Sequence, residues 1–410
     1  MNIPLTQVRF LERAVKLFHS RTAVVCEDQR WTYAEYGQGV ERLSNSLEDL
    51  GVRSGDKVAY LGFNCHRLLE CYYGVVQIGI VLLPLNIRLS SSDLEYIIRD
   101  AEPQVVFVDP DFLDKLETIL SNLPSVKSFF LLDSRMNPPD WVVGTYDGLL
   151  EKSEANHRRA PGEYPFQEDD LSELFYTSGT TGPPKGVMLT HRNLYLHTLS
   201  TMATYPISET DVQLHLIPLF HVNGWGLPHY LTAKGGTHVM IKKFEPTSVL
   251  DLIQKEKIWR LFLIPMMVNA LIEHPNFKAY DLSGLKDMLI GGAPRPTGIS
   301  GRASQAFGCT VHSGFGMTET SPLIAAPELP PGLDPETLRH RAQETRGFPM
   351  IGVEFRVVDD FGKDLPWDGV AIGELLSGGD MVMKGYLNKE AETKEALAEG
   401  WYHTGDLVSL

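Results

Sequence analysis

The amino-acid sequence predicts an α/β protein in which helices flank largely parallel sheets. Helical patterns alternate with short, wholly apolar runs through about the first 330 residues, as expected where buried parallel strands are joined by helices. The chain has 410 residues, more than one hydrophobic core normally serves, so at least two subdomains are expected. We place α/β subdomains at residues 1–170 and 171–340, and a small β-barrel-like subdomain at 341–410.

One stretch between residues 90 and 111 shows the repeating unit. Ser92 and Glu95 have the spacing of a capping box at the start of a helix. Pro103 ends that helix, and Val105–Val108 is predicted to be a buried strand. The apolar face of the helix is expected to consist of Leu94, Ile97, Ile98 and Ala101.

Later segments follow the same order until the pattern changes after Pro330. Ser248–Pro265 reads as a helix leading into a strand, and Leu285–Pro294 as a strand that ends in glycines. From about residue 345, apolar and polar residues alternate around a turn at Asp359–Gly362. This alternation predicts the small β subdomain.

Composition and charge exclude several classes of protein. A net charge of -15 opposes binding to nucleic acid, whose phosphates need a basic surface. The four cysteines show no CxxC or zinc-ligand spacing and are expected to be reduced thiols. The most apolar stretch, Gly74–Asn86, is too short to span a membrane, and charges interrupt the N-terminus where a signal peptide is apolar. We therefore expect a soluble, cytoplasmic protein.

The string YTSGTTGPPKG, Tyr176–Gly186, is the candidate binding loop. Glycine-rich loops bind phosphate because a backbone without Cβ can point several N–H groups at one anion. A predicted strand, Leu171–Tyr176, precedes the loop, and a predicted helix, VMLTHRNLYLHTL, follows it. The loop is not a Walker A sequence, because Lys185 lies three residues after Gly182 with two prolines between. Its composition alone leaves a phosphate loop and a mobile surface turn equally open.

The complete string resembles the signature loop of the adenylate-forming superfamily, which includes acyl-CoA synthetases, luciferases and peptide-synthetase adenylation domains. GFGMTETSP, Gly314–Pro322, resembles the Y-G-x-T-E motif of that family. The segments Gly373–Leu397 and Gly400–Leu407 resemble its β subdomain and ribose-binding aspartate. Trp31–Tyr36 and Tyr72–Asn86 are similar to its early motifs, so the resemblance spans about residues 30–407.

This resemblance implies that a carboxylate and ATP give an acyl-adenylate and pyrophosphate, after which a thiol, usually that of coenzyme A, takes the acyl group. It implies that Lys185, His221, Thr318 and Glu319 are catalytic, and that Thr177 and Glu319 hold Mg²⁺. Phe315 replaces the usual tyrosine, which keeps stacking on adenine but loses a hydroxyl. The implied ATP- and AMP-binding residues are Thr177, Ser178, Gly179, Thr180, Thr181, Gly182, Lys185, Gly291, Gly292, Ala293, Pro294, Ser313, Gly314, Phe315, Gly316, Thr318 and Asp406, the last accepting both ribose hydroxyls.

The stretch Leu219–Tyr230, LFHVNGWGLPHY, indicates the kind of acid. It resembles HVNxWGxPY of medium- and long-chain fatty acyl-CoA synthetases, where the tryptophan closes an acyl tunnel until ATP binds; plain core packing of Trp225 is the alternative. The stretch lacks the aspartate with which amino-acid-activating relatives bind an ammonium group, which favours an uncharged, apolar acid. The implied acyl pocket comprises His221, Val222, Trp225, Gly292 and Gly314, with Pro265, Met266 and Met267 as further candidates for its lining.

The position at which the sequence ends affects the catalytic activity that we expect. Family members continue past the position of Asp406 into a hinge and a C-terminal domain that supplies a lysine and one wall of the coenzyme A tunnel, whereas this sequence stops at Leu410. We expect such a chain to bind ATP and acyl-adenylate, to form the acyl-adenylate slowly and to form almost no thioester. The leading interpretation is a fatty acyl-CoA synthetase; the alternatives are transfer to a carrier-protein thiol and a non-catalytic ligand-binding relative. Acyl chain length and oligomeric state, a homodimer included, stay open.

Overall fold

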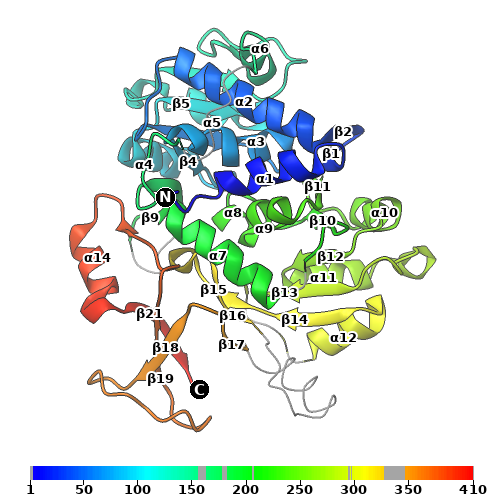
Figure 1. Ribbon diagram of the computed structural model, residues 1–410, viewed down its shortest axis with the longest axis vertical. Helices are drawn as coiled ribbons and strands as arrows, with labels where there is room; N and C mark the ends of the chain where they lie inside the picture. Colours follow the sequence, from blue (N-terminus) through cyan, green and yellow to red (C-terminus); the bar gives the residue numbers. More distant parts are fainter. Residues whose placement is uncertain are drawn as a thin grey trace.

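The computed structural model describes residues 3–155, 163–177, 182–205, 207–293, 296, 298–326 and 347–409. Two large sheets dominate it, with the blue-to-cyan part of the chain in the upper half of Figure 1 and the green-to-yellow part below. Both sheets are largely parallel, which confirms the predicted α/β class.

The first sheet has eight strands in the order β20-β9-β8-β4-β3-β5-β6-β7. The strands from β8 to β7 run parallel, while β9 and β20 add an antiparallel edge. Its strands are β3 (Lys57–Leu61), β4 (Val81–Pro84), β5 (Val105–Val108), β6 (Ser128–Leu131), β7 (Gly144–Thr145), β8 (Leu171–Thr177), β9 (Lys185–Thr190) and β20 (Gly385–Tyr386).

The second sheet has seven strands in the order β14-β13-β12-β10-β11-β1-β2, and only β2 runs antiparallel to its neighbour. Its strands are β1 (Thr22–Cys26), β2 (Gln29–Thr32), β10 (Val212–His215), β11 (Thr237–Met240), β12 (Arg260–Leu263), β13 (Asp287–Ile290) and β14 (Thr310–Ser313). The sheets therefore do not divide the chain at residue 171 as the sequence predicts. Strands β1 and β2 join the later sheet, and β8 and β9 join the earlier one, because each pairs with that sheet's edge.

Two antiparallel sheets complete the described chain, and one of them falls within residues 341–410. They are β15 (Phe315–Gly316), β16 (Leu323–Ala326) and β17 (Phe348–Pro349), and β18 (Glu354–Val358), β19 (Gly373–Gly378) and β21 (Tyr402–Val408). The predicted turn is present, with the Gly362 amide donating to the Asp359 carbonyl at 2.9 Å. In Figure 1, β18, β19 and β21 lie in orange and red at the lower left.

Three buried clusters of apolar side chains separate the layers. The central cluster lies between the two large sheets, and one further cluster covers the outer face of each. Strand β5 is wholly apolar because both of its faces are buried. Val105 and Phe107 belong to the central cluster, and Val106 and Val108 belong to an outer one. None of the described helices has the length and apolar character needed to cross a membrane.

The helices lie within these layers. The central layer holds α1 (Val8–Phe18), α2 (Tyr33–Asp49), α3 (His66–Gly74), α7 (His191–Thr204), α8 (Val222–Trp225) and α9 (Leu227–Lys234). The outer layers hold α4 (Ser91–Ala101) and α5 (Leu113–Glu117) on one side, and α10 (Pro246–Glu256), α11 (Pro265–Ile272) and α12 (Ile299–Phe307) on the other. Helix α6 (Tyr146–Leu150) also contributes Tyr146 and Leu149 to the central cluster, whereas α14 (Glu390–Ala396) has no buried residue.

Two local predictions are wrong. The capping box of α4 is formed by Ser90 and Asp93, two residues earlier than predicted, because an Asp side chain can also return the bond to the N-cap amide. The loop after β8 leads into strand β9 and not into a helix: Lys185–Thr190 pairs with β8, and Thr190 then caps α7. The candidate phosphate loop therefore connects the two strands of a hairpin.

Candidate active site

The carboxyl ends of β13 and β14 meet at the centre of the candidate site. Ile290 and Ser313 are paired in the parallel register, so Gly291 and Gly314 follow side by side. A Cβ on Gly291 would lie 3.4 Å from the carbonyl oxygen of Gly314, so the two chains are in close contact. Ligands of α/β sheets bind at this edge, where strand ends leave backbone groups free.

The segment after β14 turns sharply and presents Thr318 and Glu319 in a short 3-10 helix, η5 (Thr318–Thr320). Gly316 is required for this turn, because a Cβ there would overlap the backbone carbonyl of Pro322. Thr318 is buried, and the backbone carbonyl of Glu319 accepts a hydrogen bond from the Met383 amide at 2.8 Å. The turn is thus fixed against the segment that leads into β20.

Glu319 is a desolvated carboxyl in a basic and phenolic environment. The Tyr386 hydroxyl donates to its Oε1 at 3.0 Å, and the Lys185 ammonium lies 4.9 Å from the centre of the Tyr386 ring. Burial raises the pKa of Glu319, and the hydrogen bonds to the carboxyl and the Lys185 charge offset only part of that rise. A carboxylate held in this way would be stabilised further by a second cation.

The hairpin β8–β9 carries the candidate phosphate loop at its tip. Thr177 and Lys185 are directly paired at the base of the loop, and β20 brings Tyr386 beside Val187 on the next strand. Gly182 has a φ of 114°, which favours glycine at that position. Ser178, Gly179, Thr180 and Thr181 lie outside the described residues, as does Pro294.

The donor set fits Mg²⁺. Magnesium is usually held by one or two carboxylates and completes its shell with water and phosphate oxygens, and the Glu319 carboxylate and the Thr177 hydroxyl are oxygen donors of this kind. Among the described residues, no group of three or more His, Cys, Asp or Glu side chains has an arrangement suited to a metal ion.

Asp406 lies on β21, the strand that begins at Tyr402. Burial raises the pKa of Tyr402, and its electrostatic interactions with Glu319, Tyr386 and Asp406 raise it further. The Asp406 side chain is exposed enough to meet a ligand, although the surrounding protein raises its pKa.

The residues predicted to form the acyl pocket include an unusual backbone turn. Five successive residues have positive φ: 32° at Val222, 45° at Asn223, 58° at Gly224, 67° at Trp225 and 84° at Gly226. Three of these are not glycine, and each such conformation costs about 1–3 kcal/mol unless the surroundings enforce it. Strain of this size is typical of functional segments.

The turn places the Trp225 indole over the end of β13. A Cβ on Gly292 would lie 2.7 Å from Trp225 Cζ2, and the Phe262 ring centre is 5.8 Å from that of Trp225. Val222 is buried beside it, whereas His221 at the start of the turn is exposed, with its pKa lowered by surrounding protein and by the charge of Arg88.

Of the predicted acyl-pocket residues, Trp225 and Gly292 are thus in contact, with Val222 in the same turn. Gly314 lies against Leu323 and Leu289, one strand further along. Among the further lining candidates, Met267 packs in the outer core and Met266 is exposed.

The comparisons with known proteins agree with this geometry. The sequence matches the family of AMP-binding enzymes over residues 11–387. The chain belongs to that family. It is 35% identical over 409 residues to a long-chain-fatty-acid–CoA ligase of Thermus thermophilus, covering 97% of this chain and 74% of that protein. It is 31% identical over 411 residues to 4-hydroxybutyrate–CoA ligase 2 of Metallosphaera sedula, covering 98% and 74%.

Among solved structures, this AMP-binding enzyme resembles the inhibitor-bound N-terminal domain of FACL13 from Mycobacterium tuberculosis. The two are 25% identical with a TM-score of 0.87, and the match covers 98% of this chain and 96% of that one. The fold predicted from the resemblance of the motifs is confirmed.

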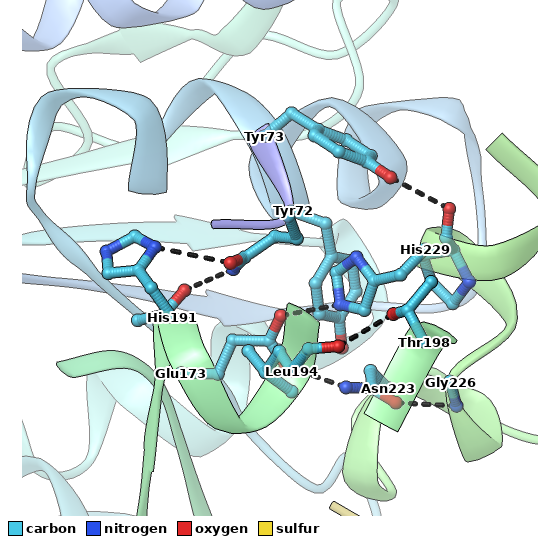
Figure 2. A network of polar contacts seen from close by, with 12 residues as sticks. Tyr72, Tyr73, Glu173, His191, Leu194, Thr198, Asn223, Gly226 and His229 are labelled. Atoms are coloured by element: carbon cyan, nitrogen blue, oxygen red, sulfur yellow. Dashed lines mark hydrogen bonds and ion pairs between the residues drawn. The ribbon is translucent and has the colours of Figure 1, made fainter. Parts of the chain in front are cut away.

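Sequence reasoning missed a buried polar network in this AMP-binding enzyme. Figure 2 shows Asn223 and His229 directed at Glu173, which lies in the middle of β8. A signal was available, because glutamate is almost never fully buried unless it is paired, and Glu173 stands in an otherwise apolar strand. Tyr386 was also missed, although its motif was identified.

A separate cavity of about 1080 Å³ lies at the carboxyl ends of β1, β3, β5 and β6. None of the predicted site residues lines it. Its charged side chains are largely paired with one another, so it offers little free charge to a phosphate. The pairs are Arg67–Asp147, Arg135–Asp133, Lys242–Glu27 and Lys243–Asp111.

Proposed function

We propose that this protein activates a carboxylic acid, most favourably a fatty acid, by forming an acyl-adenylate from ATP, and that coenzyme A then takes the acyl group. One observation carries the proposal: the desolvated carboxyl of Glu319 lies close to Lys185 at the base of the glycine-rich hairpin. A cation-seeking carboxyl next to a loop of backbone and hydroxyl donors is suited to the magnesium salt of a nucleoside triphosphate.

The chemistry asked of these residues is positioning and charge neutralisation. A substrate carboxylate oxygen attacks the α-phosphorus, the bond from that phosphorus to the bridging oxygen breaks, and pyrophosphate leaves with the electron pair. Lys185 would hold the departing phosphates, and Thr318 would orient the α-phosphate. Mg²⁺ held by Glu319 and Thr177 would supply further charge neutralisation. In the second half, the thiol sulfur attacks the acyl carbon and AMP leaves.

The acid is proposed to be uncharged beyond its carboxylate. Leu219–Tyr230 has no acidic residue. Glu173, the nearby acid in the fold, has its two oxygens bonded to His229 and Asn223, so it is not free to pair with a substrate ammonium. Val222, Trp225 and Gly292 offer apolar surface instead. The relatives named above take a fatty acid and a hydroxy acid, which supports a carboxylic acid substrate with coenzyme A as acceptor.

The proposal is tested by thermal unfolding of the protein with non-hydrolysable acyl-adenylate analogues from two to sixteen carbons. A ligand that binds only the folded state adds about 2.7 kcal/mol at a hundred times its dissociation constant. We expect stabilisation that rises with chain length and then falls where the pocket ends. Adenosine sulfamate without an acyl chain is the control for the nucleotide alone. Absence of a shift with every analogue, in a chain shown to be folded, would contradict the proposal.

A further inference from the structure

We propose that Glu173 is a positioning residue for the acyl pocket, and that it sets the acyl-chain preference by holding the turn that carries Trp225. The inference rests on the proposed function, because it concerns the same pocket. Glu173 would not touch substrate. It would act through two side chains that bracket Trp225 in the sequence, Asn223 and His229.

The first step is the burial of Glu173. Its side chain is fully buried, in the register of β8 opposite Leu189 on one neighbouring strand and Leu82 on the other. A carboxyl in such surroundings is costly unless specific partners compensate it. An apolar residue at this position would pack with less cost, so the carboxyl is expected to have a task beyond stability.

The second step is that both partners come from one segment. Asn223 Nδ2 donates to Glu173 Oε2 at 2.9 Å, and His229 Nε2 lies 2.9 Å from Glu173 Oε1. Because a carboxylate only accepts, His229 carries its proton on Nε2. One carboxyl group therefore holds both sides of the turn that contains Trp225, and Figure 2 shows the two side chains converging on it.

The third step is the orientation of the Asn223 amide. With Nδ2 given to the carboxylate, Oδ1 faces the backbone amide of Gly226 and accepts from it at 2.6 Å. This bond closes the left-handed turn around Trp225. A glutamate at 173 thus favours the orientation of the Asn223 side-chain amide in which Oδ1 faces Gly226. A weaker acceptor for Nδ2 would reduce this preference.

The backbone on either side of the turn is held independently of Glu173. The Tyr72 hydroxyl donates to the Leu219 carbonyl at 2.6 Å, and the Tyr73 hydroxyl to the Pro228 carbonyl at 3.0 Å. Replacing one of the two acceptor oxygens of Glu173 should therefore loosen the turn without displacing the segments that flank it. Because Trp225 lies against Gly291 and Gly292, movement of the turn changes the shape of the acyl pocket.

The test uses Glu173→Gln, which keeps the shape of the side chain but leaves only one acceptor oxygen for two donors. We expect the dissociation constants of the longer acyl-adenylate analogues to rise about tenfold, less than the roughly 10²-fold that a 1 Å misplacement can cost a reaction rate. The length giving tightest binding should shift, while the dissociation constant of ATP stays within about twofold. Acrylamide should quench the tryptophan fluorescence of Glu173→Gln more strongly than that of the wild type. Adding Trp225→Phe to both proteins should abolish this difference. Glu173→Asp, with two acceptors, should restore part of the length preference.

A second variant keeps the inference testable if Glu173→Gln does not fold. Asn223→Gly cuts the connection between Glu173 and the turn, and glycine accepts the φ of 45° without strain. It should shift the length preference in the same direction. An unchanged length profile and unchanged quenching in a folded variant would overturn the inference, as would an equal loss of ATP affinity. If the wild-type protein binds no analogue at all, the proposed function itself has failed.

Discussion

Glu319→Gln is expected to lower acid-dependent acyl-adenylate formation about 10²–10³-fold, the size of effect seen when one preorganised electrostatic group is removed from an active site. Glutamine has the same shape and can still accept the Tyr386 hydrogen bond, so the fold should persist. The lost component is the negative charge that would hold Mg²⁺ beside the phosphates. The rate is measured as acyl hydroxamate formed in the presence of hydroxylamine.

The matched control for this variant is Glu354→Gln, at an exposed position on β18. It should leave the rate of hydroxamate formation unchanged. Tyr386→Phe keeps the Glu319 charge and removes only a hydrogen bond, so its effect should be smaller than that of Glu319→Gln. If Glu319→Gln forms adenylate at the wild-type rate, the metal assignment is wrong.

Asp287→Asn is expected to destabilise the protein by about 3–5 kcal/mol, because it removes the negative charge of a carboxyl that is paired with a buried guanidinium. Arg260 is 1% exposed, and its Nε lies 2.6 Å from Asp287 Oδ1, while His312 Nε2 lies 2.9 Å from Oδ2. The group stands at the amino ends of β12 and β13, opposite the catalytic end of the sheet. The free energy of unfolding in urea should fall, with ligand binding in the folded fraction retained.

The same carboxyl predicts a pH dependence. The His312 and Arg260 contacts hold the pKa of Asp287 below its usual value in spite of burial. A lowered folded-state pKa means that the stabilisation is complete above about pH 4 and is lost as the pH falls through the folded value. Wild-type protein should therefore lose more stability on acidification than Asp287→Asn does. Asp281→Asn, which breaks the exposed pair with Lys257, is the control and should change stability little. Equal acid dependence in wild type and Asp287→Asn would contradict the assignment.

The fold was predictable where burial leaves little choice. The run Val105–Val108 could only be a strand with both faces covered, and the two core clusters that it joins confirm this. The segment Lys185–Thr190 was misjudged because its apolar residues are compatible with a helix or a strand, and pairing with β8 decides between them. The capping box was also misplaced: the sequence pointed to Ser92 and Glu95, whereas the structure uses Ser90 and Asp93.

The candidate site likewise has a part that the sequence predicts and a part that it does not. Thr318, Glu319 and Asp406 were predicted because their motifs are ordered strings, and the structure places Tyr386 between Glu319 and Lys185. The left-handed turn and its support by Glu173 could not be predicted, because they depend on contacts between residues 50 and 56 positions apart. Local sequence carries no information on such pairs beyond the oddity of a buried acid.

The central claim is that a carboxylate attacks the α-phosphorus of ATP, and transfer of an oxygen label tests it most directly. The protein is incubated with MgATP, hydroxylamine and octanoate labelled with ¹⁸O in both carboxylate oxygens. The molecular masses of the products are then measured by mass spectrometry. Attack at the α-phosphorus predicts octanoyl hydroxamate, unlabelled pyrophosphate and AMP carrying one ¹⁸O atom. Formation of ADP with labelled inorganic phosphate, or release of AMP without label, would contradict the account.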